Sequence, residues 1–214
     1  MLLYLIRHGE SSYNSEGRIQ GQSDTPLSEL GRRQGLAVAA AFGAQAATQR
    51  IGALFASPLS RALDTARPLA DALDLPIQTD DRLKEIHAGV FQGLIWPEIH
   101  ERYPEAGVAW QSQDPDVRIP GGESRRELMA RGRAALEAVR ETGVDRAVVV
   151  AHGGILSAAL KSLLGIPAER NPFMLYNGSI SLIEWRQQFK LVTLNQMDHL
   201  TAGGVDLRTR TGDL

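Results

Sequence analysis

The sequence predicts an α/β protein, a three-layer α/β/α sandwich around a mostly parallel central sheet. Continuous apolar runs at Leu2 to Ile6, Ile51 to Ala56 and Ala147 to Ala151 are typical of parallel strands that are buried on both faces. Segments with helical spacing separate and follow these runs. An alternation of this kind indicates β-α units with helices covering both faces of the sheet.

Each predicted helix has the spacing or the boundary residues that helices require. The first follows Pro26 and has Ser28 as its N-cap, since serine can accept a hydrogen bond from the first turn. The last is stopped by Gly165 and Pro167. The helices are expected at Ser28 to about Ala47, Ser60 to Leu73, Glu123 to Glu141 and Ile155 to Leu164. An edge hairpin is expected from Ile180 to Trp185 and from Phe189 to Leu194.

The size and composition fit a single domain over residues 1–214. The chain is 43% hydrophobic and 22% charged, which is enough apolar surface for one substantial core. Glycine and proline punctuate the middle third, so we expect an inserted cap or lid at about 86–122. The polar tail at about 201–214 is expected to be mobile or to fold over a neighbouring surface.

Composition also narrows the partners. A formal net charge of -2 provides no general attraction for nucleic acid or an anionic membrane, so an anionic ligand needs a local cluster of cations. The absence of cysteine excludes disulfides and thiolate catalysis. The apolar N-terminal run is too short for a signal peptide or a membrane span. We therefore expect a cytoplasmic protein with a small-molecule partner, and a homodimer remains an open alternative.

Polar residues follow three of the predicted strands. Arg7 and His8 come after the first run, Ser57 after the second with Arg61 beyond it, and His152 after the third. Taken alone, each residue would more often be an ordinary polar side chain. However, ligand sites in open α/β sheets gather beyond the carboxyl ends of the strands. Both histidines also precede a glycine, which leaves room for a close neighbour, so one pocket is predicted.

These segments resemble the motifs of one known family. Leu5 to Ser11 resembles the RHG signature of the histidine phosphatase superfamily, which includes cofactor-dependent phosphoglycerate mutases and many broad phosphatases. Ser57 to Ala66 is similar to the second arginine motif, Leu83 to Gly93 to the acid motif and Val150 to Gly154 to the second histidine motif. The resemblance implies a phosphoglycerate-mutase-like fold.

The resemblance also implies roles for the strand-end residues. His8 would attack phosphorus and become phosphohistidine, while Arg7, Arg61 and His152 hold the phosphoryl oxygens. Two guanidiniums and an imidazolium can match this charge with no metal and no cofactor. His8 must attack as neutral imidazole, so its other ring nitrogen should bond to a backbone carbonyl, with Gly9 giving the ring room.

The remaining contacts come from loops and from the acid motif. Asn14, Gln20 and the backbone of Gly21 resemble additional phosphate contacts of the family, and Gly153 is grouped with them. Glu85 is the candidate general acid, which protonates the leaving alkoxide and then activates water.

Two local features bear on the surroundings of the reaction. Without the resemblance, Glu85 would be interpreted as a surface carboxylate that pairs with Arg82 or Lys84. Four aromatic residues are candidates for an apolar wall around the leaving group, although aromatic residues in such a chain more often belong to the core. The candidate wall residues are Phe91, Trp96, Trp110 and Tyr176.

The function expected is a metal-independent phosphomonoesterase. The main alternative is a cofactor-dependent phosphoglycerate mutase. Mutases of the superfamily carry a lysine and an arginine pair in an insertion after the acid motif, whereas Leu94 to Pro120 has Arg102 and Arg118 but no lysine and no arginine pair. Such a site should struggle to hold phosphoglycerate for reorientation.

Two further classes stay open as alternatives. A phosphate-binding module without turnover would keep the fold, but the retained histidines, arginines and acid argue against it. A metal hydrolase would use His8, His152 and Glu85 as ligands, yet the sequence has no short ligand spacing of the HExxH kind.

Overall fold

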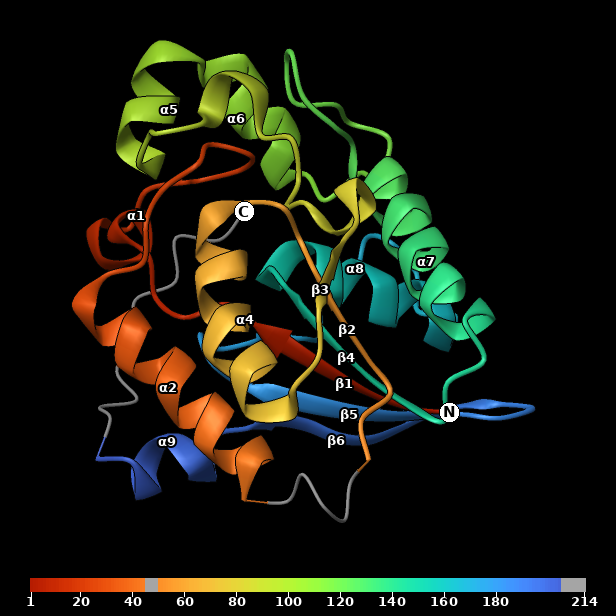
Figure 1. Cartoon of the computed structure of the whole chain (residues 1–214). Coiled ribbons are helices and arrows are strands. Elements are labelled where there is room, and N and C mark those ends of the chain that lie inside the picture. Colours follow the sequence, from red (N-terminus) through yellow and green to blue (C-terminus); the bar gives the residue numbers. More distant parts are fainter. Residues whose placement is uncertain (45–49, 205–214) are drawn as a thin grey trace.

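The computed structural model describes residues 1–44 and 50–204. Within these ranges a six-stranded sheet has the order β3-β2-β4-β1-β5-β6 (Figure 1). The strands are β1 (Leu2–Arg7), β2 (Ala53–Ala56), β3 (Ile77–Thr79), β4 (Arg146–Ala151), β5 (Ile180–Trp185) and β6 (Phe189–Gln196). Neighbours from β3 to β1 run parallel, and β5 and β6 are antiparallel. The mostly parallel sheet and its edge hairpin are therefore confirmed.

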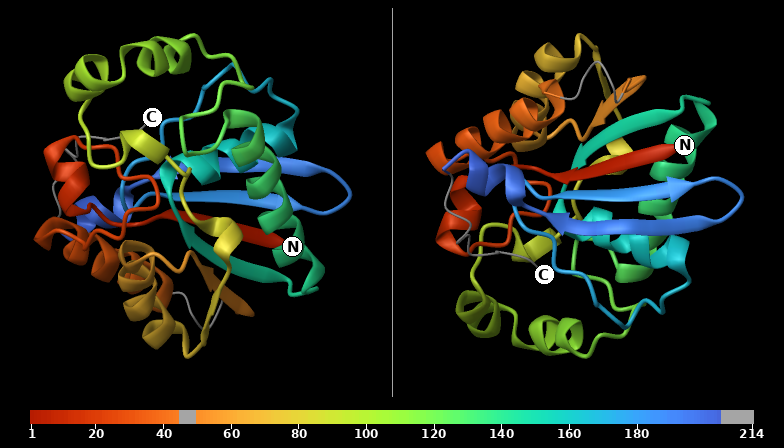
Figure 2. Two further views of the ribbon diagram at one scale, coloured as in Figure 1. Left: turned by 90° about the horizontal axis from the view of Figure 1, so that it is seen from above. Right: turned by 90° about the horizontal axis from the view of Figure 1, so that it is seen from below.

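Helices cover both faces of this sheet. Helices α2 and α4 lie on one face and α7 and α8 on the other, as the views in Figures 1 and 2 show. The helices are α1 (Ser12–Glu16), α2 (Glu29–Gly43), α4 (Ser60–Leu73), α5 (Trp96–Arg102), α6 (Pro104–Gln111), α7 (Arg125–Glu141), α8 (Gly153–Leu164) and α9 (Asp198–Ala202), with 3-10 turns η1 (Asp81–Leu83) and η2 (Gly89–Phe91). The predicted three-layer α/β/α sandwich is confirmed.

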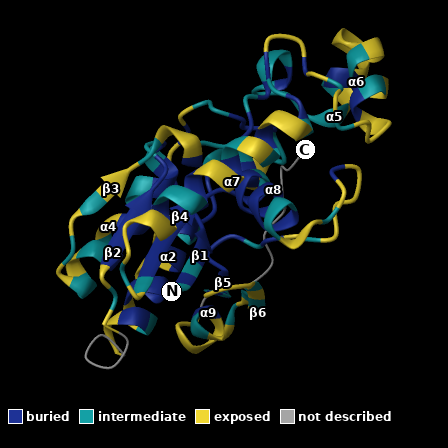
Figure 3. Ribbon diagram, turned by 90° about the vertical axis from the view of Figure 1, so that its right-hand side faces the viewer, coloured by how far each residue is buried: buried dark blue, intermediate teal, exposed yellow. Residues whose placement is uncertain are grey.

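Apart from Arg7 at the end of β1 and Arg146 at the start of β4, the central strands are almost entirely apolar, because each face packs against helices. Leu3 and Leu5 of β1 belong to the core that includes Leu136 of α7, whereas Ile6 belongs to a second core that includes Val38 of α2. Figure 3 shows the central strands of the sheet in the colour of buried residues. Two-sided burial explains why these strands lack the polar alternation of a solvent-facing sheet.

Local boundary residues set the ends of the main helices. Ser28 caps α2 by accepting a hydrogen bond from the Gly31 N–H at 3.0 Å, and Gly165 ends α8 in the left-handed region at a φ of 67°. The structure starts α8 at Gly153 and α7 at Arg125, within two residues of the predicted starts. The end predicted for the first helix, near Ala47, lies outside the described residues.

The middle third contains two helices that the sequence pattern does not predict. Pro97 and Pro104 look like breaks in the sequence, but each stands in the first turn of a helix, α5 and α6. Proline is tolerated there because the first N–H groups of a helix have no intrahelical acceptor. The single domain and the cap at 86–122 remain predictions.

Near the C-terminus, α9 packs onto α2 through Leu200 and Ala37. The first residues of the predicted mobile tail, Thr201 and Ala202, form the end of this helix, and residues 205–214 lie outside the described ranges. In the described part of the chain, no helix has both the length and the apolar character needed to cross a bilayer.

The loop that follows β1 crosses the first turn of α2 at two glycines. A Cβ on Gly31 would overlap the Glu10 carbonyl oxygen, and a Cβ on Gly9 would overlap the Gly31 carbonyl. The crossing is tied by the Ser28 N–H, which donates to the Glu10 carbonyl at 2.8 Å. Because His8 directly precedes this loop, the crossing fixes the position of the histidine.

Replacing Gly31 by alanine should therefore be costly. We expect Gly31→Ala to lower the free energy of unfolding by roughly 1–3 kcal/mol, because backbone atoms must move to admit the methyl group. Gly43→Ala in the same helix is the matched control, since its Cβ would lie 3.6 Å from the Ala72 Cβ, an ordinary contact. Urea denaturation measures both. Equal stability of the two variants would contradict the close crossing.

Candidate active site

A cavity of about 300 Å³ lies at the carboxyl ends of β1 and β4. Seven of the nine predicted site residues line it, namely Arg7, His8, Gln20, Gly21, Arg61, Glu85 and Gly153. The other two, Asn14 and His152, are fully buried and do not contribute to its wall. Residues from distant parts of the sequence thus meet where the parallel strands end.

The ring of His8 is held in one tautomer. Its Nδ1 lies 2.6 Å from the carbonyl oxygen of Gly9, so Nδ1 donates and the Nε2 lone pair remains available. Burial, followed by the charges of Arg61 and Arg7, lowers the pKa of His8 well below its ordinary value. The predicted hydrogen bond to a backbone carbonyl is present. Gly9 was expected to leave room for the His8 ring, but the space where its Cβ would lie faces the backbone of Gly31.

His152 lies beside this nucleophile candidate. The two ring centroids are 5.0 Å apart, and the Nε2 of His152 is 2.8 Å from the Ser57 hydroxyl at the end of β2. Its buried Nδ1 has no hydrogen-bond partner among the described residues. Burial and then Arg61 lower the pKa of His152 well below its ordinary value. In the protein without ligand, a lowered pKa favours the neutral ring, and the imidazolium expected with a bound phosphoryl group stays a prediction.

Two buried guanidiniums are oriented by backbone carbonyls. Arg7 donates from Nη1 to the Leu175 oxygen at 2.5 Å. Arg61 donates from its two terminal nitrogens to the oxygens of Gly21 and Ser23, each at 2.8 Å. Burial lowers the pKa of Arg61 to about 10, so its side chain stays positively charged at neutral pH.

Gly153 lets one of these cations approach the start of α8. A Cβ on Gly153 would lie 3.3 Å from the Nη1 atom of Arg7, tighter than most side-chain contacts. The room that glycine was expected to leave after His152 is therefore occupied by the guanidinium of Arg7.

The amides of Asn14 and Gln20 have their oxygen atoms occupied. The Oε1 of Gln20 accepts hydrogen bonds from the hydroxyls of Ser11 and Thr25, each at 2.6 Å. The Oδ1 of Asn14 accepts from the Ser11 N–H at 3.1 Å, while its buried Nδ2 has no partner among the described residues. Both amides are thus left with N–H groups as their remaining polar function, as a phosphate contact requires.

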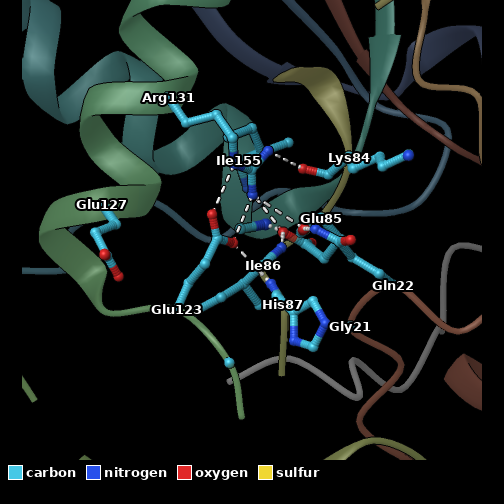
Figure 4. A network of polar contacts seen from close by, with 12 residues as sticks. Gly21, Gln22, Lys84, Glu85, Ile86, His87, Glu123, Glu127, Arg131 and Ile155 are labelled. Atoms are coloured by element: carbon cyan, nitrogen blue, oxygen red, sulfur yellow. Dashed lines mark hydrogen bonds and ion pairs between the residues drawn. The ribbon is translucent and has the colours of Figure 1, made fainter. Parts of the chain in front are cut away.

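The carboxylate of Glu85 is bound by backbone N–H groups (Figure 4). Its Oε2 accepts from Gly154, and its Oε1 from Ile86 and from Ile155, each at 2.9 Å. Gly154 and Ile155 lie in the first turn of α8, where the helix dipole favours negative charge. The structure therefore stabilises the form of Glu85 that accepts a proton.

Two other interpretations of Glu85 do not match the structure. Arg82 and Lys84, its expected surface partners, pair instead with Asp80 at 2.7 Å and Asp81 at 3.1 Å. Within residues 1–44 and 50–204, no three histidine or carboxylate side chains are grouped so that they could hold a metal ion.

An ion pair behind Glu85 holds its backbone in place (Figure 4). Arg131 donates to the carbonyl oxygens of Lys84 at 2.6 Å and of Glu85 at 3.1 Å, and it pairs with Glu123 at 2.7 Å. Glu123 in turn accepts from the His87 N–H at 2.7 Å. This network is not predicted from the sequence because it joins residues that no local pattern relates.

The rest of the cavity wall includes apolar side chains, such as Leu128, Phe173 and Leu175, but few of the aromatic residues named as candidates. Of the four aromatic candidates, only Trp110 belongs to the cavity wall. Phe91 lies in the core and Trp96 packs against it. Tyr176 does not line the cavity. Arg125 and Lys161 also line the cavity. Lys161 stands within the otherwise apolar sequence of α8, and this unusual position could have indicated a positive charge in the cavity.

Comparison with known proteins gives consistent results. The profile of the histidine phosphatase superfamily (branch 1) matches residues 3–197. A metal-independent phosphoserine phosphatase of Arabidopsis thaliana is 38% identical over 99% of this chain and 88% of its own length. A probable phosphoglycerate mutase GpmB of Klebsiella pneumoniae is 37% identical over 95% of this chain and 97% of its own. A mycobacterial glucosyl-3-phosphoglycerate phosphatase, solved with VO3, has a TM-score of 0.80 and 33% identity over 92% and 99% of the two chains.

The electrostatics of the two histidines can be tested directly. Because their pKa values are lowered, both rings should stay neutral at pH 6.5, the ordinary histidine pKa. Nitrogen-15 NMR of the imidazoles in the protein without ligand measures this, with the His8 signal showing a proton on Nδ1. Half-protonation of either ring at pH 6.5 would contradict a lowered pKa for that histidine.

Proposed function

The chain belongs to the histidine phosphatase superfamily, and on this premise we propose that it hydrolyses small phosphomonoesters through a phosphohistidine on His8. The observation that carries the proposal is the placement of His8, with its Nδ1 bonded to the Gly9 carbonyl, in the same cavity as the buried guanidiniums of Arg7 and Arg61, and its lowered pKa agrees with a neutral ring. A neutral nucleophile and fixed cations are what attack on an anionic phosphoryl group requires.

In the first step the phosphoryl group binds between the guanidiniums, which have N–H groups suited to forked bonds with its oxygens. The Nε2 of His8 attacks phosphorus, the bond from phosphorus to the ester oxygen breaks, and Glu85 protonates the departing alkoxide. The buried Nδ1 of His152 and the Nδ2 of Asn14, both unpartnered among the described residues, would become donors to the phosphoryl oxygens.

In the second step water attacks phosphohistidine and releases inorganic phosphate. Glu85, now a carboxylate again, removes the proton from this water. The N–H groups of the first turn of α8 stabilise the carboxylate needed for this half-reaction. An incoming anionic phosphoryl group disfavours the same charge, which promotes protonation of Glu85 before the alkoxide leaves.

The relatives support hydrolysis over the mutase alternative. They include a phosphoserine phosphatase and a glucosyl-3-phosphoglycerate phosphatase, both named for hydrolysis of a small phosphorylated compound. Other relatives are named as phosphoglycerate mutases, each of them only as a probable one. Assays with 3-phosphoglycerate, with and without its bisphosphate, separate release of phosphate from isomerisation. A cytoplasmic location and a possible homodimer remain predictions.

Removing the proposed nucleophile should abolish turnover without unfolding the protein. We expect His8→Ala to lower kcat for p-nitrophenyl phosphate on the order of 10³-fold or more. Wild-type enzyme quenched during turnover should carry an acid-labile, alkali-stable phosphoryl group that the variant lacks. His100→Ala, which changes an exposed histidine outside the cavity, is the matched control. Near wild-type turnover of His8→Ala would exclude His8 as nucleophile.

The role of Glu85 depends on the leaving group. p-Nitrophenolate departs without a proton, whereas an alkoxide needs one. Glu85→Gln should therefore keep a stoichiometric p-nitrophenol burst but lose the later steady rate, and it should hydrolyse alkyl phosphates far more slowly. Stopped-flow absorbance measures the burst, and a retained burst also shows that the variant is folded. Equal slowing of both substrates with no burst would assign the acid and base to another residue.

A further inference from the structure

The cavity contains two cations that the proposed reaction at phosphorus does not use. Arg125 begins α7 and Lys161 lies in α8, the helix packed against it. Both line the same cavity as His8. Within the described residues, neither has an aspartate or glutamate at ion-pair distance.

Arg125 differs from three other arginines of its helix, because those three form ion pairs and Arg125, within the described residues, does not. The three lie close to a carboxylate, in the pairs Arg126 with Asp116, Arg131 with Glu123 and Arg133 with Glu137. Arg125 instead lies over the Trp110 ring, with its guanidinium carbon 3.6 Å from the ring centroid. Arg140 likewise lies over a tryptophan ring, that of Trp185 at 5.0 Å, but of the arginines of α7 it is Arg125 that lines the cavity.

Hydrogen-bond donors at this stack are unsatisfied. The Nη1 of Arg125 and the Nε1 of Trp110 are buried, and neither has a hydrogen-bond partner in the described part of the chain. Burial lowers the pKa of Arg125 to about 10, which leaves it charged at neutral pH. Buried donors without acceptors are costly, so an acceptor that enters the cavity would be bound favourably.

Lys161 adds a second positive charge. It is 5% exposed, and its Nζ donates to the Ala168 carbonyl at 3.2 Å, which leaves further N–H groups for a ligand. Burial and then the charge of Arg125 lower its pKa, and Glu169 offsets this only as a lesser influence. The two cations therefore repel each other in a partly desolvated site, and an anion between them would relieve that repulsion.

We propose that Arg125 and Lys161 bind a carboxylate on the alcohol part of the substrate. The proposal rests on the proposed function, because the same cavity must hold the phosphoryl group at His8. A volume of about 300 Å³ for both groups indicates a compact phosphorylated acid. The planar fork of a guanidinium matches a carboxylate, so the substrate class is small phosphomonoesters with a carboxylate in the alcohol part.

A pair of substrates isolates this contact. 3-Phosphoglycerate and glycerol 3-phosphate differ only in a carboxylate that replaces a hydroxymethyl group, and p-nitrophenyl phosphate reports the phosphoryl chemistry alone. The variants are Arg125→Gln and Lys161→Met, which remove charge but retain much of each side chain. Arg126→Gln is the matched control, since it changes the neighbouring arginine outside the cavity.

We expect kcat/KM for 3-phosphoglycerate, relative to glycerol 3-phosphate, to fall about tenfold or more in each variant and to stay at the wild-type ratio in Arg126→Gln. Turnover of p-nitrophenyl phosphate should change by no more than about twofold, which shows that the variants are folded. An unchanged ratio in both variants, or a wild-type enzyme without preference for the carboxylate, would overturn the proposal.

Binding separates this inference from the proposed function. If the wild-type protein hydrolyses none of the three compounds, the proposed function fails, and calorimetry of 3-phosphoglycerate and glycerol 3-phosphate still tests the carboxylate site. Tighter binding of 3-phosphoglycerate that is lost in Arg125→Gln supports the site. Equal binding of the two compounds overturns it.

Discussion

Buried positive charge is the constraint on which the site depends. The guanidiniums of Arg7 and Arg61 lie at the end of the sheet, where burial removes the water that would otherwise stabilise them. Carbonyl dipoles from Leu175, Gly21 and Ser23 orient them but contribute no full negative charge. Burial and then these charges lower the pKa values of the neighbouring imidazoles, and the same charges favour an anion in the cavity.

Helix α8 connects the parts of this field. Its first turn donates N–H groups to the Glu85 carboxylate, and Gly153 at the same turn admits the guanidinium of Arg7. Arg131 holds the Glu85 backbone from α7. The acid and Arg7 therefore meet at one helix start, whereas Arg61 is held separately by the carbonyls of Gly21 and Ser23.

The sequence predicts the fold and the positions of candidate site residues correctly where a local pattern of residues determines the structure. Two-sided burial makes the central strands apolar runs, and the strand ends locate Arg7, His8 and His152 without knowledge of any contact. It was insufficient for three-residue β3, which is too short to have a pattern, and for α5 and α6, whose initial prolines look like breaks. The bond from Ser57 to His152 joins residues far apart in the chain, and no spacing rule contains it.

The same limit applies to the alcohol part of the substrate. The segment from Leu94 to Pro120 lacks a lysine and an arginine pair, yet α7 and α8 bring Arg125 and Lys161 into the cavity from outside it. The lack of cations in one insertion therefore does not make the pocket apolar. If Arg125 and Lys161 bind the carboxylate as proposed, the alcohol formed by phosphoryl transfer would keep that contact but no longer share the contacts of the phosphoryl group with Arg7 and Arg61. It would then bind more weakly than the intact substrate, which would favour its exchange for water over return of the phosphoryl group.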